Sequence, residues 1–349
     1  MPSYSLNRSF PPKPRTGSLT VAITIGDPFG IGPEVVLKAL ANPVLLHRQK
    51  SGIRSKLSGR ADFLIIGDKT VLSSLPKFLN TVLRVNPHIS IADLGLISEE
   101  RIKWGRQSGL SGKASLAYID YALKLIKDGQ ADCLVTAPVS KEAISRAGIR
   151  FSGHTEYIAK AFNTDKFAMM LVGGPLKVTL VTRHLPLKAV AKAVTENEIS
   201  DCIELSYAAL KRYFGIKRPR IGVASLNPHG GEGGSIGKEE ERVIKPAVAR
   251  AKKRFKGITG PASSEALFYE AFGGRLDCVI AMYHDQGLTP LKMVARDNSV
   301  NVTLGLPFVR TSPGHGTAFD IAGKGIANAE SMAEAIRLAI NMHNANLKT

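Results

Sequence analysis

The sequence predicts an α/β protein made of two α/β/α domains, each with a central and mostly parallel sheet. Short apolar runs of strand length alternate along the chain with longer amphipathic stretches. The apolar runs are not interleaved with polar residues, and Gly or Pro often separates them from the next stretch. Strands that are apolar on both faces are buried on both faces, which is typical of parallel sheets covered by helices.

The first half of the chain shows this alternation from residue 18 onward. Pro33 suits the first turn of a helix, where its missing N–H leaves no bond unmade, and Gly129 suits a helix C-terminus. The elements expected here are strands over 18–26, 61–68 and 131–138 and helices over 33–43 and 116–129.

The second half continues the pattern. Its helices are recognised by apolar residues three and four positions apart, and its strands by continuous apolar runs. The elements expected here are strands over 176–184, 218–229 and 276–284 and helices over 196–215, 238–255, 263–274 and 331–347.

The chain is strongly basic, with 47 Lys and Arg against 29 Asp and Glu and a formal net charge of +18. Such a charge favours anionic partners, either nucleic acid or small anionic substrates. Residues 47–60 are rich in basic side chains but hold no aromatic residue on which bases could stack. We therefore favour a solvated basic surface over a nucleic-acid-binding protein, and expect no nucleic-acid partner.

No apolar run is long enough to span a membrane, and residues 1–18 lack the apolar core of a secretory signal. These first residues are basic and Pro-rich, so we expect a disordered tail. Cys133, Cys202 and Cys278 are widely spaced and form no CxxC pair. Reduced, buried thiols in a cytoplasmic protein without a membrane partner are therefore expected.

Polar loop motifs follow the predicted strands at their C-terminal ends. They read TIGDPFGIGPE, VTAPVSK, VTRHLPL, LNPHGGEGG and AMYHDQG. Ligands of open α/β sheets bind at this edge, so we expect the functional site there.

Three histidines lie in such loops with Gly or Pro nearby, namely His184, His229 and His284. A ring in this setting is presented from a turn rather than packed on a helix face. Neutral imidazoles from three loops suit a divalent metal that keeps an open position for substrate. We predict a metal site on these residues; zinc is favoured, and magnesium, cobalt, nickel and manganese are the alternatives.

Two motifs leave their interpretation open. Gly26, Gly30 and Gly32 follow the spacing G-x3-G-x-G, which matches neither the dinucleotide fingerprint nor the Walker A loop. A tight turn and a ligand loop are equally consistent with it. His154 and Thr155 lie near a helix start, where they serve either as a cap or as part of an anion site.

The segment 281–325 is densest in candidate site residues. Lys292 and Arg310 are suited to pair with a phosphate or carboxylate, and Asn301 lies between them in the sequence. Asp320 is flanked by small residues in the stretch HGTAFDIAGKGIAN. An acid in such a loop suits both hydroxyls of an adenosine ribose, which favours NAD over NADP.

Taken together, these motifs resemble the 4-hydroxythreonine-4-phosphate dehydrogenase family of vitamin B6 synthesis. The resemblance rests, in order between residues 20 and 325, on GDPFGIGPE, TAPVSK, FSGHTEY, TRHLPL, LNPHGGEGG, AMYHDQGLTPLK, VNVTLGLPFVRTS and HGTAFDIAGKG. The HGTAFDIAGKGIAN loop also resembles the adenosine-binding loop of isocitrate and isopropylmalate dehydrogenases, whose two-domain fold this family shares.

The resemblance implies an isocitrate/isopropylmalate dehydrogenase-like fold with the active site in the cleft between the domains. We expect a first α/β domain over 19–135 plus 305–349, and a second over 136–304 that carries the metal and dimer contacts. The family is a homodimer whose sites are shared between subunits. By resemblance, His284 is the metal ligand that comes from the partner chain.

We expect the residues that match the family's motifs to have the roles that these positions have in the family. The metal ligands are His184, His229 and His284; the substrate positions are His154, Thr155, Lys292, Asn301 and Arg310; the NAD positions are Gly316, Thr317, Ala318 and Asp320. Asp285 is the candidate for orienting a ligand histidine or for proton transfer, and Lys141 is the second catalytic candidate.

The implied function is the NAD-dependent, metal-assisted oxidation of 4-phosphooxy-L-threonine in pyridoxal 5′-phosphate biosynthesis. The β-keto acid product then loses its carboxylate to give 3-amino-2-oxopropyl phosphate. The chain departs from the family at three places: Arg183 and Gly314 replace a usual threonine and aspartate, and Ser264, Glu265 and Ala266 replace a triplet similar to Ala-Asp-Thr. The alternative is therefore a D-threonate or D-erythronate 4-phosphate dehydrogenase of the same family.

Overall fold

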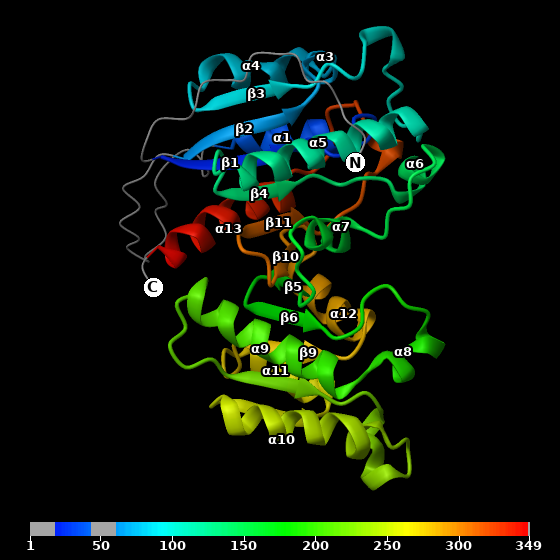
Figure 1. Ribbon diagram of the computed structural model, residues 1–349, viewed down its shortest axis with the longest axis vertical. Coiled ribbons are helices and arrows are strands. Elements are labelled where there is room, and N and C mark those ends of the chain that lie inside the picture. The colour runs from blue at the N-terminus through cyan, green and yellow to red at the C-terminus, as the bar shows by residue number, and fades with distance from the viewer. Residues whose placement is uncertain (1–17, 43–60, 348–349) are drawn as a thin grey trace. The chain divides into compact units, whose positions relative to one another are not determined.

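The computed structural model describes residues 18–42 and 61–347 (Figure 1). The expected tail, apart from Ser18, and the basic stretch 47–60 lie outside the described residues. The chain divides into two compact units. One runs to Ile158 and includes Phe308–Ile340, and the other comprises Ala159–Pro307 and the chain from Asn341.

The first unit holds parallel strands in the order β3-β2-β1-β4-β11. Its strands are β1 (Leu19–Thr24), β2 (Ala61–Gly67), β3 (Ile89–Asp93), β4 (Cys133–Thr136) and β11 (Val309–Pro313). Its helices are α1 (Gly32–Leu40), α3 (Lys69–Ser73), α4 (Lys77–Val85), α5 (Gly109–Lys127) and α6 (Lys141–Arg146), with short 3-10 turns η1 (Glu99–Arg101) and η4 (Phe319–Ile321). Helices α7 (His154–Ala161) and α13 (Glu330–Asn346) begin in this unit, and their last residues belong to the second.

Helix α5 is longer than the sequence predicts, because it begins at Gly109 rather than at residue 116. Ser108 caps it by accepting a hydrogen bond from the N–H of Ser111 at 3.1 Å. Gly112 allows α6 to approach, since a Cβ at that position would lie 2.2 Å from the carbonyl oxygen of Ala143. The predicted end is confirmed: the helix stops at Lys127, and Gly129 follows with a φ of +65°.

The second unit mixes parallel and antiparallel pairs in the order β10-β5-β6-β9-β7-β8. Strand β5 pairs antiparallel with β10 and β6, and the remaining pairs are parallel. Its strands are β5 (Ala168–Gly173), β6 (Leu176–Leu180), β7 (Ile221–Ala224), β8 (Ile258–Ala262), β9 (Cys278–Ala281) and β10 (Val300–Leu304). Its helices are α8 (Leu187–Ala193), α9 (Glu196–Arg212), α10 (Lys245–Arg254), α11 (Ser264–Phe272) and α12 (His284–Ala295), with a 3-10 segment η2 (Pro228–Gly234) and a π-helical turn η3 (Glu240–Ile244).

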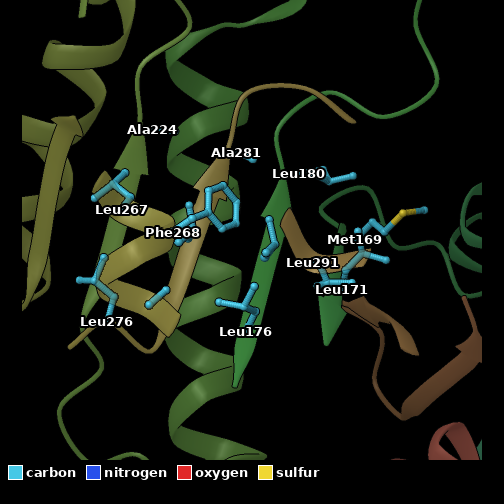
Figure 2. Close-up of a cluster of buried hydrophobic side chains, with 13 residues drawn as sticks. Met169, Leu171, Leu176, Leu180, Ala224, Leu267, Phe268, Leu276, Ala281 and Leu291 are labelled. Atoms are coloured by element: carbon cyan, nitrogen blue, oxygen red, sulfur yellow. The ribbon is translucent and has the colours of Figure 1, made fainter. Parts of the chain in front are cut away.

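Helices cover both faces of this second sheet. Neighbouring side chains of a strand point to opposite faces. On β6, the hydroxyl of Thr179 lies 2.7 Å from that of Ser206 on α9, whereas Val178 and Leu180 belong to a buried cluster with Leu291 of α12. Figure 2 shows this cluster, in which side chains of α11 and α12 pack on β6, β7 and β9. The expected α/β class with a mostly parallel sheet is confirmed.

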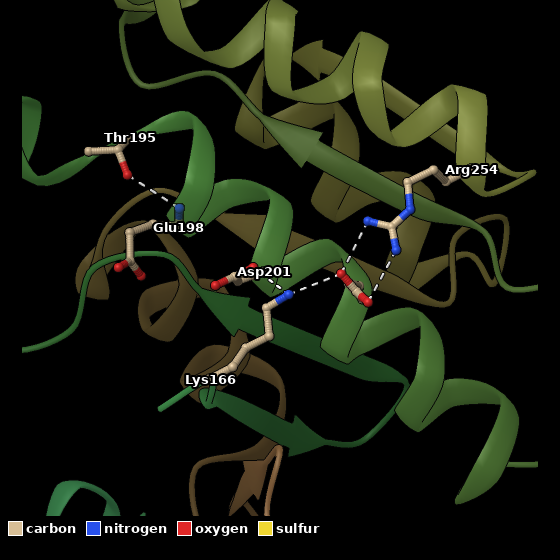
Figure 3. A network of polar contacts seen from close by, with 6 residues as sticks. Lys166, Thr195, Glu198, Asp201 and Arg254 are labelled. Atoms are coloured by element: carbon tan, nitrogen blue, oxygen red, sulfur yellow. Dashed lines mark hydrogen bonds and ion pairs between the residues drawn. The ribbon is translucent and has the colours of Figure 1, made fainter. Parts of the chain in front are cut away.

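The outer face of α9 carries a charged network that reaches α10 (Figure 3). Lys166 lies 2.6 Å from Asp201 and 3.0 Å from Glu204, and Arg254 lies 3.2 Å from Glu204. Thr195 caps the helix by accepting from the N–H of Glu198 at 3.2 Å. These ion pairs are largely exposed, so each contributes only about 0–1 kcal/mol.

Two further expectations concern the cysteines and membrane-spanning helices. The three cysteines are buried and free, as predicted. Within the described residues, no helix is long and apolar enough to cross a membrane.

Candidate active-site residues

Arg310 is a buried cation on β11. Its side chain is among the largest fully buried ones, with 1% of the residue exposed, and its Nη2 donates to Oγ1 of Thr136 on β4 at 2.5 Å. Burial lowers the pKa of Arg310 to about 10, and Glu156 partly opposes this effect. A guanidinium is still charged at neutral pH, and a buried charge is costly unless an anion or strong acceptor meets it.

His154 adds a second nitrogen base to this region. It is the first residue of α7, and its Nε2 is buried without a hydrogen-bond partner among the described residues. Burial, followed by the positive charges of Arg310 and Lys141, holds the pKa of His154 well below its usual range. The ring is therefore neutral at physiological pH and can donate to a ligand from a helix N-terminus, where anions bind well.

Thr155 and Lys141 lie beside this pair. Thr155 is 3% exposed and lies inside the first turn of α7 rather than before it. Lys141 begins α6 after Ser140, whose hydroxyl caps that helix by accepting from Ala143 at 3.1 Å. The first unit thus brings together Lys141, His154, Thr155 and Arg310, a set of cations and donors suited to a phosphate or carboxylate.

His184 and His284 come together in the second unit. His184 follows β6, and the two rings have centroids 5.7 Å apart. The expectation that His284 sits in a loop is corrected, because it is the first residue of α12. Its Nδ1 lies 2.7 Å from Oδ1 of Asp285, a bond that leaves Nε2 available to a ligand.

His229 lies in a separate, unusual loop. Residues 229–233 all have positive φ, including His229 at 52° and Glu232 at 43°. Buried Glu240 anchors the loop by accepting from the N–H groups of Leu226 and Asn227, both at 2.8 Å. Among the described residues of this one chain, no three His, Cys, Asp or Glu side chains are grouped to hold a metal ion.

Lys292 and Asn301 lie on α12 and β10 of the second unit. Lys292 donates to the hydroxyl of Ser299 at 2.8 Å, and burial lowers its pKa. The Oδ1 of Asn301 is buried without a partner in the described part of the chain. The predicted substrate positions are therefore divided, with His154, Thr155 and Arg310 in the first unit and Lys292 and Asn301 in the second.

The predicted NAD positions lie on one loop of the first unit, residues 314–327. Gly316 is exposed, and a Cβ there would meet nothing within 4 Å. Thr317 accepts a hydrogen bond from the N–H of Ile31 at 2.9 Å, and Ala318 has a left-handed φ of 37° before η4. Asp320 is exposed on η4. An open glycine on the same loop as an exposed carboxylate fits a nucleoside with free ribose hydroxyls.

Comparison with known proteins identifies the family. The model of a family described as "Pyridoxal phosphate biosynthetic protein PdxA" matches residues 59–339. The chain belongs to this family. A 4-hydroxythreonine-4-phosphate dehydrogenase of Geobacter metallireducens is 41% identical over 334 residues, covering 92% of this chain and 95% of that protein.

Other relatives of this PdxA family member differ in their names. A D-threonate 4-phosphate dehydrogenase of Cupriavidus necator is 40% identical, covering 91% of this chain and 95% of that protein. The solved structure of a 4-hydroxythreonine-4-phosphate dehydrogenase of Klebsiella pneumoniae is 35% identical and superposes with a TM-score of 0.78. The superposition covers 93% of this chain and 100% of that protein. The fold is therefore that of the PdxA family.

The residues that depart from the family's pattern have contacts within their own units. The guanidinium of Arg183 lies over the ring of Phe167 at 5.0 Å. The N–H of Gly314 donates to the hydroxyl of Ser331 at 2.8 Å. The pKa of Glu265 is lowered, mainly by hydrogen bonds from its own backbone N–H and from Ser263. The nearby His229 lowers the pKa of Glu265 further, by a smaller amount.

Asp27, in the GDPFGIGPE motif, was not among the predicted site residues. It is fully buried, accepts from the N–H of Phe29 at 3.0 Å, and lies 3.3 Å from the hydroxyl of Ser111. Burial raises its pKa to about 6, and the two hydrogen bonds partly oppose the shift. The position of Asp27 directly after a predicted strand could have indicated a site residue. An aspartate next to glycines, however, is equally typical of an ordinary turn.

Proposed function

We propose that this chain is an NAD-dependent dehydrogenase that oxidises 4-phosphooxy-L-threonine to a β-keto acid. That acid decarboxylates to 3-amino-2-oxopropyl phosphate, a precursor in pyridoxal 5′-phosphate biosynthesis. The observation that carries the proposal is the buried guanidinium of Arg310 beside the unpartnered Nε2 of His154. Such a site suits a phosphate dianion, because two fixed donors and a nearby ammonium can meet it together.

The remaining substrate contacts follow from the positions of other polar groups. Thr155 supplies a hydroxyl next to His154, and Lys292 and Asn301 supply an ammonium and an amide. The buried Oδ1 of Asn301 accepts a hydrogen bond from the substrate, which satisfies an atom that otherwise has no described partner. An amino group on the substrate is the natural donor to such an acceptor.

The cofactor is NAD, bound through Gly316, Thr317, Ala318 and Asp320. The carboxylate of Asp320 accepts both hydroxyls of an adenosine ribose and repels a 2′-phosphate, which disfavours NADP. The open space at Gly316 lets the ligand approach the backbone closely.

A divalent metal is proposed at His184, His229 and His284; zinc is favoured, with magnesium, cobalt, nickel and manganese as alternatives. The bond from Asp285 to Nδ1 of His284, which leaves Nε2 of that ring available, supports this assignment. When bound, the metal supplies Lewis acidity and NAD supplies the hydride acceptor.

The chain's own residues move the protons. Asp285 fixes the tautomer of His284 and is the candidate acceptor for the proton of the substrate hydroxyl. Lys141, whose charge acts on His154, is the second candidate for proton transfer. We further propose that the active enzyme is a cytoplasmic homodimer in which each site is completed by a histidine from the other subunit.

A second candidate function is oxidation of D-threonate or D-erythronate 4-phosphate. A relative named for D-threonate 4-phosphate is 40% identical to this chain, which keeps this alternative open, although more of the similar relatives are named for 4-hydroxythreonine-4-phosphate. Arg183, Gly314 and Ala266 differ from the family's usual residues, so they are the positions that would account for this different substrate.

The test is a competition of the three phosphorylated acids by kcat/KM with NAD. A site built to bind the amino group rejects analogues without it by orders of magnitude, because its polar groups are left unpaired. The proposal expects 4-phosphooxy-L-threonine to exceed both sugar acids by at least about a hundredfold. A higher kcat/KM with either sugar acid would transfer the assignment to that substrate.

A further inference from the structure

Helix α1 carries an acid–base pair that is turned toward the protein rather than toward solvent. Glu34 and Lys38 lie one helical turn apart, with Nζ of Lys38 2.9 Å from Oε1 of Glu34. The Glu34 side chain is fully buried, and that of Lys38 is 22% exposed. Helical pairs with this spacing usually lie on the surface and stabilise little. The burial of this pair suggests that both side chains also bind other groups of the protein.

The pair binds the main chain at the end of the 314–327 loop. Glu34 accepts from the N–H of Gly325 at 3.0 Å and from that of Ala327 at 2.6 Å. Lys38 donates to the carbonyl oxygens of the same two residues, both at 2.8 Å. Two side chains thus satisfy the N–H and C=O groups of Gly325 and Ala327, as a neighbouring strand would in a sheet.

The start and middle of the loop pack against the segments that precede α1 and α5. A Cβ at Gly30 would lie 3.0 Å from the carbonyl oxygen of Thr317, a tight contact that a larger residue could make only if the loop shifted. A Cβ at Gly323 would lie 2.6 Å from the ring of Trp104. Gly30 of the GDPFGIGPE motif therefore packs against the loop, whereas Gly26 and Gly32 of the same motif pack against the backbone of Pro138 and Ile25.

We propose that Glu34 and Lys38 are positioning residues that fix the 314–327 loop in its ligand-ready form and thereby set the affinity for NAD. The inference rests on the proposed function, because it takes Gly316 and Asp320 as the groups that meet the nucleoside. A loop that is already ordered does not lose conformational entropy when the ligand arrives, so affinity rises without any new contact to it.

The experiment compares the wild-type enzyme with Lys38→Met, Glu34→Gln and a control. Lys38→Met keeps the apolar stem of a partly exposed side chain and removes two donors to the loop. Glu34→Gln keeps the size of a buried side chain but turns an amide NH₂ toward a backbone N–H. The matched control is Asp128→Asn, which breaks the exposed Lys124–Asp128 pair, also one turn apart, on the same unit.

Two readouts separate loop order from catalysis. Amide hydrogen exchange at Gly325 and Ala327, measured without NAD, reports whether the loop is held. The chain has a single tryptophan, Trp104, which contacts the loop at Gly323, so its fluorescence follows NADH binding directly. Steady-state kinetics then divide any effect between KM for NAD and kcat.

For Lys38→Met we expect exchange at both amides to accelerate and the Kd of NADH to rise about tenfold, the effect of losing one or two hydrogen bonds. The KM for NAD should rise in parallel with kcat almost unchanged, and Asp128→Asn should match wild type. Unchanged exchange, or faster exchange with unchanged NADH affinity, would overturn the positioning role. Failure of the wild-type enzyme itself to bind NADH would instead refute the proposed function.

Discussion

At the scale of single residues, buried ionisable groups mark the places where the chain departs from ordinary packing. Asp27 and Arg310 are buried, as is Nε2 of His154, and the pKa values of all three groups shift for the same first reason, the loss of water around the charge. Arg310 and His154 were identified from the sequence. Their burial was not, because a lone arginine or histidine in a motif is equally consistent with a surface ion pair or a helix cap.

Replacing Arg310 by Met should disable substrate binding more than it disables folding. The variant removes a buried charge and fills its space with an apolar chain, which is often neutral for stability. Loss of a charged hydrogen-bond donor to phosphate should lower kcat/KM by at least about a hundredfold, mainly through KM. The matched control is Arg337→Met, whose guanidinium pairs with Glu334 on α13. Equal kcat/KM values for the two variants would exclude Arg310 from the phosphate site.

Asp27 should make stability fall as pH rises. Its pKa is raised from 3.8 to about 6 in the folded chain, so between these values the folded state holds more protons than the unfolded one. The contribution of this group is therefore fully present below the unfolded pKa and is lost as the pH rises through about 6. Its size is about 3 kcal/mol, from 1.36 kcal/mol for each pKa unit.

Urea unfolding of wild type and Asp27→Asn at several pH values between 4 and 7 measures this contribution. The free energy of unfolding of the variant, relative to wild type, should increase by about 2–2.5 kcal/mol over this range, because part of the full contribution is already lost at pH 4. The amide keeps an acceptor for the N–H of Phe29 and carries no charge at any pH. Parallel stability curves would mean that Asp27 has an ordinary pKa.

At the scale of elements, the sequence was most informative where apolar runs are long. Strands β1, β2, β4, β6, β7 and β9 lie within predicted strands. The sequence analysis did not predict β3, β5, β8, β10 and β11. Strand β8 reads ITGPA and β11 reads VRTSP, so Gly, Pro and polar residues hide them. Their strand conformation comes from pairing with neighbours, which no local pattern encodes.

Helices α5 and α12 show the same limit. The N-terminal part of α5 reads GLSGKAS, and its two glycines and two serines have low helix propensity. Tertiary packing against α6 at Gly112 compensates for that. Helix α12 contains Pro290 and starts at His284, which made the segment resemble a loop.

Gly112→Ala should therefore destabilise the first unit although alanine favours helices. The added methyl group would lie 2.2 Å from the carbonyl oxygen of Ala143 and 2.4 Å from the nitrogen of Ile144. Backbone cannot yield as a side chain can, so we expect a loss of about 1–3 kcal/mol in the free energy of unfolding. Lys113→Ala, at the exposed neighbouring position, should change stability by less than about 0.5 kcal/mol. Thermal and urea unfolding of both variants give the comparison, and a stabilising Gly112→Ala would contradict the close contact.

At the scale of the whole molecule, two compact units each carry part of the predicted substrate set. The predicted metal histidines lie in the second unit, where His184 and His284 are adjacent and His229 stands on its own loop. The sequence motifs located these side chains at strand ends. They could not indicate which of them meet within one chain, because that depends on the placement of loops and of a second subunit.

If each site is completed by His284 of the other subunit, two inactive variants should restore activity when mixed. His284→Ala and Arg310→Met place their defects on different chains of a hybrid dimer, so one of its two sites is intact. Random exchange makes about half the dimers hybrids, which predicts recovery of about a quarter of wild-type activity. The control mixes Arg310→Met with His154→Ala, whose residues lie in the same unit, and should recover nothing. Equal recovery or none in both mixtures would contradict the shared site.

The most direct test of the account is the appearance of NADH when the purified protein is mixed with NAD and 4-phosphooxy-L-threonine. The account predicts substrate-dependent NADH that a chelator abolishes and a divalent metal restores. NADH formation that a chelator leaves unchanged would contradict the metal site. No NADH from a metal-loaded protein would contradict the substrate assignment.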